Sequence, residues 1–128
     1  AARGSRYPGL GGPLGPMDAK AMDKNNFLKM IAAGRDSALL RFTLGNLYLE
    51  EDDAAAAAEH LRRAVDLDAG YAAAWKQLGK ALLALGREDE ARAAWGDGIA
   101  AASAKGSVQA VKEMQVQLRR LDKKRQPS

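Results

Sequence analysis

The chain offers few residues whose types and spacing could support catalysis. It has one histidine, His60, and no cysteine, which excludes a thiol nucleophile and a disulfide framework and argues against a structural zinc site. A lone histidine with no second base or nucleophile at helical distance is more often a packing or surface residue. The sequence contains no Ser-His-Asp set, phosphate-binding loop or metal-binding cluster. We therefore expect no enzymatic activity and no cofactor.

Acidic and basic residues gather in two separate segments of the chain. Residues 50–68 hold seven acidic and two basic residues, whereas residues 105–128 hold seven basic and two acidic ones. The run from Glu50 to Asp53 lacks the alternating ligand spacing of a calcium loop, so we interpret it as a solvated turn with a helix cap. With a net charge of +4, the molecule is electrically polarised, a pattern that can steer association with a partner.

The densest positive cluster lies near the C-terminal end and comprises Arg119, Arg120, Lys123, Lys124 and Arg125. Cations that end a helix interact favourably with its dipole, which is a sufficient reason for the cluster. The alternative is contact with nucleic acid or with an acidic partner. No aromatic residue is interleaved with the cluster, so bases would have no stacking platform, and nucleic acid is the less favoured partner.

The composition favours closely packed helices. Apolar residues, many of them alanine, make up 47% of the 128 residues and aromatic residues only 5%, which fits one helical domain better than a sheet sandwich. No apolar run reaches the ~18 residues of a membrane span, and the beginning of the sequence lacks the apolar segment of a secretory signal. We expect no membrane contact and a cytoplasmic location.

Apolar spacing and capping residues predict six helices and no strands. Residues 1–17 are rich in Gly and Pro and are expected to form a disordered tail. A single domain is predicted over residues 18–122, with a capping helix at 18–34, helix pairs at 37–70 and 71–104, and a C-terminal capping helix at 107–122. The basic residues 123–128 are expected to fray.

The two helix pairs repeat each other at a spacing of 34 residues. The matching positions are Leu44 and Leu78, Gly45 and Gly79, Ala57 and Ala91, and Leu61 and Trp95. A fixed period with helical spacing inside each unit indicates a helix-turn-helix repeat array. Because glycine inside a helix costs ~1 kcal/mol relative to alanine, its presence at the same place in both units predicts close helix packing there, beside Leu61 and Trp95.

At these positions the chain resembles the tetratricopeptide repeat family, whose pattern runs W-x2-L-G-x2-Y, then A-x3-F, then P. The second unit supplies Trp75, Leu78, Gly79, Leu82, Ala91 and Trp95, and the first supplies Arg41, Leu44, Gly45, Tyr48, Ala57 and Leu61. The resemblance is to a small bacterial-type member with two full repeats and flanking capping helices. It implies an all-α fold of antiparallel helix-turn-helix repeats that form a right-handed α-solenoid. Arg41 replaces the tryptophan of the first unit, which predicts altered packing at that end.

The resemblance also implies a binding groove lined by the first helix of each pair. Carried over to this sequence, the groove residues are Leu39, Phe42, Thr43, Asn46, Leu49, Lys76, Gln77, Lys80 and Leu83. Helical spacing independently places Phe42, Asn46 and Leu49 on one side of their helix. It does the same for Lys76, Lys80 and Leu83. Amides, lysines and apolar side chains suit a short acidic or C-terminal peptide, although a solvated face is an equally simple interpretation of the lysines. The family's carboxylate clamp is not expected, because Phe42 occupies the place of a clamp lysine.

These features predict a protein–protein interaction module with an adaptor, scaffold or assembly role. Two alternatives remain at this point. The chain could be a structural subunit that associates with itself, since two repeats are fewer than the ~3 that usually suffice for stability. It could also be an accessory that binds nucleic acid through the basic C-terminal helix. The expected oligomeric state is a monomer or a weak homodimer.

Overall fold

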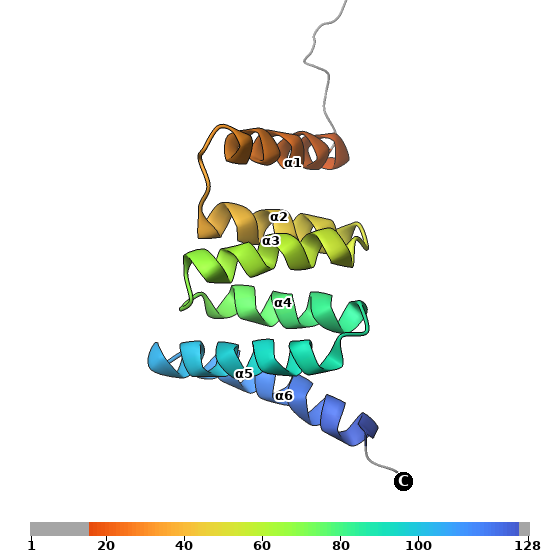
Figure 1. The fold of residues 1–128 in the computed structure, drawn as a ribbon, viewed down its shortest axis with the longest axis vertical. Helices are drawn as coiled ribbons and strands as arrows, with labels where there is room; N and C mark the ends of the chain where they lie inside the picture. The colour runs from red at the N-terminus through yellow and green to blue at the C-terminus, as the bar shows by residue number, and fades with distance from the viewer. Residues whose placement is uncertain (1–15, 126–128) are drawn as a thin grey trace, which may run out of the picture. The chain divides into compact units, whose positions relative to one another are not determined.

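The structure is a computed structural model that describes residues 16–125, with side chains described for residues 24–124. Within this range the chain forms six α-helices and no strand, which confirms the predicted all-α fold class (Figure 1). The helices are α1 (Pro16–Ala32), α2 (Ala38–Glu50), α3 (Ala54–Leu67), α4 (Ala72–Ala84), α5 (Glu88–Ala104) and α6 (Val108–Arg125). No helix among the described residues combines the length and apolar composition that crossing a membrane requires.

The bounds of α1 and α6 differ from the prediction, and α1 ends at Ala32 rather than at residue 34. Helix α1 begins at Pro16 rather than at residue 18, because proline fits the first helical position, where no N–H partner is needed. Helix α6 continues to Arg125 rather than ending at residue 122, because lysine and arginine are good helix formers and their charges suit the C-terminal dipole. The other residues of the two predicted tails, 1–15 and 126–128, lie outside the described residues.

The described residues fall into two compact units, one up to Arg35 and one from Asp36 onwards. The first contains α1, which ends in a glycine-closed turn as predicted. Gly34 has a φ of 89°, and the Arg35 N–H donates to the Met30 carbonyl over 2.8 Å. Such a turn satisfies carbonyl groups that the helix end leaves without partners. The proposal that this helix covers an end of the repeats stays a prediction.

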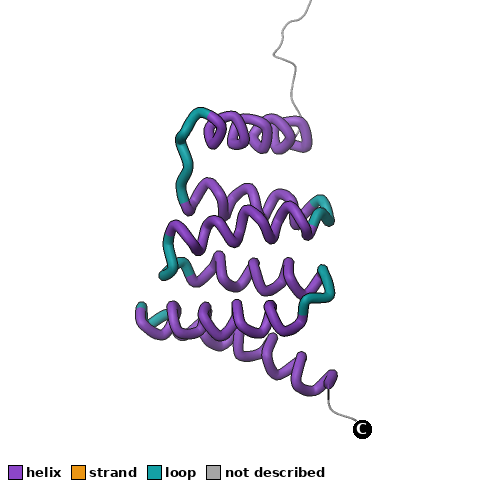
Figure 2. The backbone as a smooth tube through the Cα atoms, in the orientation of Figure 1, coloured by secondary structure: helices purple, strands orange, loops and turns teal. Residues whose placement is uncertain are grey.

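The second unit is a succession of antiparallel helices. Helix α2 pairs with α3, α4 pairs with α5, and each helix packs on the next, with α6 running obliquely to α5 (Figure 2). Helix α4 also contacts α2, and α6 contacts α4 in the same way. Helix α6 thus packs on α4 and α5 as α4 packs on α2 and α3. The largest fully buried side chains are Trp95, Leu44, Leu61, Leu78, Leu82 and Met114.

Side-chain caps and special turns explain where the helices begin and end. The Ser37 hydroxyl accepts a hydrogen bond from the Leu40 N–H at the start of α2, and the Asp53 carboxylate accepts one from the Ala56 N–H at the start of α3, both over 3.1 Å. Serine and aspartate are among the residues preferred at this position, because their side-chain oxygens accept from N–H groups that the helix leaves without partners. Helix α5 has no side-chain cap, but its first turn holds three acidic residues that favour the helix dipole.

The doubled glycines permit close helix packing, as predicted. A Cβ atom added at Gly45 would overlap the Leu61 side chain, and one added at Gly79 would overlap the Trp95 indole. Leu61 is fully buried and Trp95 is 1% exposed. The Trp95 Nε1–H also donates to the Lys76 carbonyl over 3.0 Å, which fixes the ring against α4. Glycine therefore replaces alanine here because a large side chain of the partner helix occupies the space.

Candidate functional site

Two open clefts adjoin each other along α4. The first has a volume of about 650 Å³ and is lined by Asn46, Leu49, Glu50, Asp52, Ala54, Gln77, Lys80 and Ala84. The second has a volume of about 560 Å³ and is lined by Lys76, Gln77, Lys80, Leu83, Trp95, Glu113, Gln117 and Arg120. Gln77 and Lys80 line both clefts. We therefore treat the two as one surface, the α4 groove, which extends from α2 across α4 to α6.

Most of the residues predicted to line a groove do line this one. They are Asn46, Leu49, Lys76, Gln77, Lys80 and Leu83. The other three are not among its lining residues. Leu39 is 65% exposed, the Thr43 hydroxyl donates to the Leu39 carbonyl over 2.8 Å, and the Phe42 ring lies 4.9 Å from the Tyr71 ring. Phe42 thus packs α2 against the beginning of α4.

An amide pair lies where the two clefts meet. The Gln77 Nε2 amide donates to the Asn46 Oδ1 oxygen over 2.8 Å and joins α4 to α2. This bond uses one N–H and one oxygen of the pair. The Gln77 oxygen and the Asn46 amino group have no other side-chain hydrogen bond within the described residues. One side-chain acceptor and one side-chain donor of the pair therefore remain for a ligand, and a peptide backbone offers the matching groups.

Lys76 lines the groove, but its ammonium group is paired with a carboxylate of the same chain. Its ammonium group donates to Glu113 Oε1 over 2.9 Å, and Gln109 donates to Glu113 Oε2 over 3.2 Å. The hydrogen bond from Lys76 is the main reason why the pKa of Glu113 is lowered, and the Gln109 bond adds to it. The charges of Lys76 and Glu113 therefore largely cancel within the groove.

Lys80 is the lysine that the groove leaves available. It is exposed, it lines both clefts, and its ammonium group makes no hydrogen bond or ion pair with any residue in the described part of the chain. A lysine of this kind can pair with a carboxylate at little desolvation cost. The sequence analysis grouped Lys76 with Lys80, but of these two lysines only Lys80 has no ion-pair partner among the described residues.

Helix α6 supplies one wall of the groove, which the sequence-based prediction missed. Its contributions are Glu113, Gln117 and Arg120. A signal was present in the sequence: Met114, Leu118 and Leu121 repeat Leu78, Leu82 and Leu85 with the same internal spacing. Met114 and Leu121 are buried, and Leu118 is partly buried against the core. The offset is 36 residues rather than 34, because α5 is longer than α3. A search at the fixed period of 34 residues therefore does not show that α6 takes the position of the first helix in a third pair.

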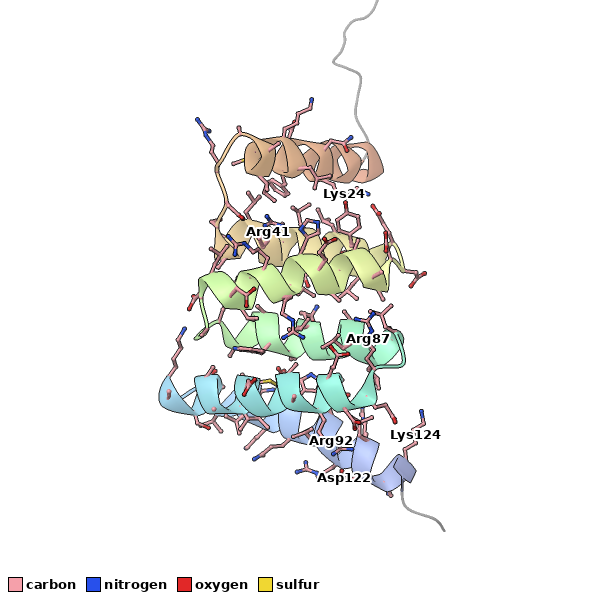
Figure 3. All side chains as sticks on the ribbon, viewed as in Figure 1. Lys24, Arg41, Arg87, Arg92, Asp122 and Lys124 are labelled. Carbon is pink, nitrogen blue, oxygen red and sulfur yellow. The ribbon has the colours of Figure 1, made fainter. Side chains whose placement is uncertain are left out.

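The predicted basic cluster lies on the C-terminal half of α6. Arg119, Arg120, Lys123 and Lys124 are exposed, and the side chain of Arg125 lies outside the described ones. Arg120 alone of these lines the groove. The neighbouring Asp122 is paired with Arg92 of α5, and Figure 3 shows the two side chains together where α5 meets α6. The basic cluster and the groove thus meet at Arg120.

Arg41 occupies the place of the missing tryptophan and organises a polar cluster. Its guanidinium donates to both carboxylate oxygens of Asp36, over 2.7 and 2.9 Å, and to Nδ1 of His60 over 3.0 Å. Figure 3 labels Arg41 on α2. The hydrogen bond from Arg41 is the main cause of the lowered pKa of Asp36. This bidentate pair confirms that packing at the tryptophan position is altered.

His60 is a packing residue with a perturbed pKa. Its ring stacks on Tyr48 with centroids 5.3 Å apart and an angle of 3° between the planes. Burial lowers the pKa of His60, and the nearby charge of Arg41 lowers it further. Because Arg41 donates to Nδ1, the neutral ring carries its proton on Nε2. The contacts of His60 are structural, as the sequence predicted.

Comparison with known proteins gives concordant results. A family model described as tetratricopeptide repeat matches residues 48–112. The TPR repeat-containing protein PA0015 of Pseudomonas aeruginosa is 55% identical over 97 residues, which are 76% of this chain and 92% of that protein. The solution structure of protein BPP2914 from Bordetella parapertussis is similar with a TM-score of 0.68 and 48% identity, covering 79% of this chain and 88% of that one. The crystal structure of MamA is similar with a TM-score of 0.55 and 25% identity, covering 84% of this chain and 71% of that one.

Proposed function

Because the chain belongs to the tetratricopeptide repeat family, we propose that it binds a peptide or a protein segment in the α4 groove. Repeats of this family generally mediate protein–protein interaction and are typically not enzymes. On this proposal the protein has an adaptor, scaffold or assembly role. The ligand lies across the first helices α2 and α4 and reaches α6.

The observation that carries this proposal is the amide pair in the middle of the groove. The Gln77 oxygen and the Asn46 amino group can bind a ligand without breaking the bond between the two side chains. An extended peptide presents alternating N–H and C=O groups, and it satisfies one acceptor and one donor side by side. The two amides are interchangeable at this contact, because either orientation leaves one of each group available.

The groove also offers apolar contact on both sides of the amide pair. Leu49 lines the cleft towards α2, and Leu83 lines the cleft towards α6. Both are partly buried and pack against the core, so an apolar ligand side chain would meet an ordered surface. Burial of such a side chain contributes roughly 25 cal/mol per Å². Apolar anchors would supply affinity, while the amides fix the position of the backbone.

A steric block of the groove tests this proposal. Random peptides of about twelve residues are displayed and selected for binding to the wild-type protein. This is about twice the number of residues that an extended chain needs to cross the groove. Selected peptides are then titrated against Ala84→Trp, which fills the first cleft, and against Ala93→Trp as the matched control. Both alanines are exposed and helical, but only Ala84 lines the groove.

We expect Ala84→Trp to weaken binding of the selected peptides about tenfold or more, a loss of about 1.4 kcal/mol, while Ala93→Trp leaves it unchanged. Circular dichroism verifies that both variants keep the helical fold. The proposal is wrong if no peptide is enriched, or if the enriched peptides bind Ala84→Trp as tightly as the wild type.

A further inference from the structure

The two ends of the α4 groove carry opposite charge. The cleft beside α2 is lined by Glu50 and Asp52, and the cleft beside α6 is lined by Arg120. Lys80 lies between them and lines both. Lys76 and Glu113 form an ion pair with each other, so they add little net charge to either end. Glu50 already makes an interaction within the protein, so Asp52 carries the negative charge of its end. The groove is therefore acidic at Asp52, in the turn between α2 and α3, and basic from Lys80 to α6.

We propose that the ligand is a bipolar segment, with a basic residue over the α2–α3 turn and an acidic residue over Lys80 and Arg120. This inference rests on the proposed function and specifies its ligand. A segment of a single charge would meet repulsion at one end of the groove, whereas a bipolar one meets attraction at both. Such charge complementarity across an interface sets orientation and excludes wrong partners.

The arrangement of the helices gives the separation of the two charges. Helices α2 and α4 are in contact, and so are α4 and α6. Packed helix axes lie 8–10 Å apart, so the groove spans roughly 16–20 Å from α2 to α6. An extended chain rises about 3.3 Å per residue, so the basic and acidic residues of the ligand are about five or six residues apart.

Arg120 and Lys80 suit the acidic residue of the ligand for a second reason. Neither side chain forms an ion pair or a hydrogen bond with another described residue. Arg120 also belongs to the basic cluster that continues along α6. A ligand carboxylate at this end therefore displaces no internal partner. Its attraction is reinforced by cations beyond the groove, and this contribution weakens as salt screens it.

Asp52 allows a clean test of the acidic end. It has a φ of 61°, a conformation that asparagine tolerates as well as aspartate does. Asp52→Asn therefore removes the charge with the backbone unchanged. Arg120→Gln does the same at the basic end. The matched controls are Asp66→Asn and Arg119→Gln, both at exposed positions outside the groove.

The peptides selected on the wild-type protein are sequenced and titrated against these four variants. We expect enriched peptides to carry a basic and an acidic residue about five or six positions apart. Asp52→Asn should lower the affinity for these peptides roughly three- to tenfold, as expected for a partly screened charge pair. It should not change the affinity for a peptide whose basic residue is replaced by alanine. Arg120→Gln should lower the affinity for the selected peptides in the same way, and it should not change the affinity for a peptide whose acidic residue is replaced by alanine. The two controls should change nothing.

The outcomes separate this inference from the proposed function. Selected peptides could bind Ala84→Trp more weakly than the wild type but bind Asp52→Asn and Arg120→Gln as tightly. In that case the proposal of a bipolar ligand is wrong, and the proposal of groove binding stands. The same conclusion follows if Asp52→Asn acts through the acidic residue of the peptide, because the orientation is then reversed. If no peptide responds to Ala84→Trp, groove binding itself is wrong and the inference fails with it.

Discussion

The indole ring of Trp95 occupies the space that a side chain at Gly79 would need. The same relationship holds between Leu61 and Gly45 in the first helix pair. In both pairs a glycine on the first helix lets a large residue of the second helix lie directly against the backbone. The two contacts differ in one respect, because the indole is rigid and is held by a hydrogen bond to the Lys76 carbonyl, whereas leucine can change rotamer.

Gly79→Ala should therefore lower the free energy of unfolding by about 2 kcal/mol, because overpacking outweighs the ~1 kcal/mol that alanine gains in helix propensity. Gly45→Ala should cost less, since Leu61 can adjust. Gly96→Ala is the control: Gly96 lies in α5 with no atom near its would-be Cβ, so this change should stabilise the protein. Urea unfolding monitored by circular dichroism measures all three. An equal effect at Gly79 and Gly96 would contradict the packing argument.

Local signals predicted most of the fold. Ser37, Asp53 and Gly34 each do at a helix end what their residue types predict, since capping depends on neighbours within a few residues. The repeated Leu-Gly positions predicted the close packing, because the glycine and the large residue that packs on it belong to the same repeat. These features are readable because each is encoded within one repeat.

The groove was only partly predictable, because its remaining residues are brought together by tertiary packing. Lys76 meets Glu113 from 37 positions away, and no local pattern indicates that they pair. Arg120 joins the groove because α6 takes the place of another first helix after a longer α5, which changes the period. Arg41 appeared as a departure from the repeat pattern, but its partners Asp36 and His60 depend on how a loop and two helices meet.

Stability should fall as the pH drops below neutral, because protonation would place a charge on the partly buried His60 ring and, in addition, beside the guanidinium of Arg41. The pKa of His60 is lowered in the folded state from its ordinary value of 6.5. The unfolded chain therefore binds more protons between these two values, so the free energy of unfolding rises with pH across this window. The contribution is fully present well above 6.5 and is lost as the pH falls from 6.5 to the folded pKa.

Urea unfolding at about pH 7.5 and about pH 5.5 measures this effect, which is bounded by about 1.4 kcal/mol per unit of pKa shift. The chain has one histidine, so His60→Phe should remove most of the pH dependence in this range while keeping a ring against Tyr48. A pH dependence that survives in His60→Phe would show that another group is responsible.

Asp52→Gly should stabilise the fold. Asp52 has a φ of 61°, and the equivalent position 34 residues later is Gly86, with a φ of 77°. Non-glycine residues in this conformation carry strain, and aspartate tolerates it better than most, so relief should contribute about 0.5–1 kcal/mol. Gly86→Asp should have the opposite sign. Thermal unfolding of both variants tests the pair, and a lower melting temperature for Asp52→Gly would contradict the prediction.

Loss of the Asp122 carboxylate should loosen the end of α6. Asp122 accepts a hydrogen bond from Arg92 Nη1, while Arg92 Nε and Nη2 are buried without a partner among the described residues. Asp122→Ala leaves the whole guanidinium without an acceptor, so the free energy of unfolding should fall by about 1 kcal/mol, more than a fully exposed pair contributes. Amide hydrogen exchange over residues 118–125 should accelerate as that part of α6 detaches from α5.

The matched control for this pair is Arg62→Ala. Arg62 approaches Glu90 only to 3.9 Å, and its side chain is 46% exposed. Removing it should change stability by no more than about 0.5 kcal/mol and leave exchange in α6 unaltered. If Asp122→Ala behaves like Arg62→Ala in both measurements, the contact between Arg92 and Asp122 does not hold α6 in place. Because Arg120 lies in the same part of α6, a loosened helix end should also weaken ligands that depend on the basic end of the α4 groove.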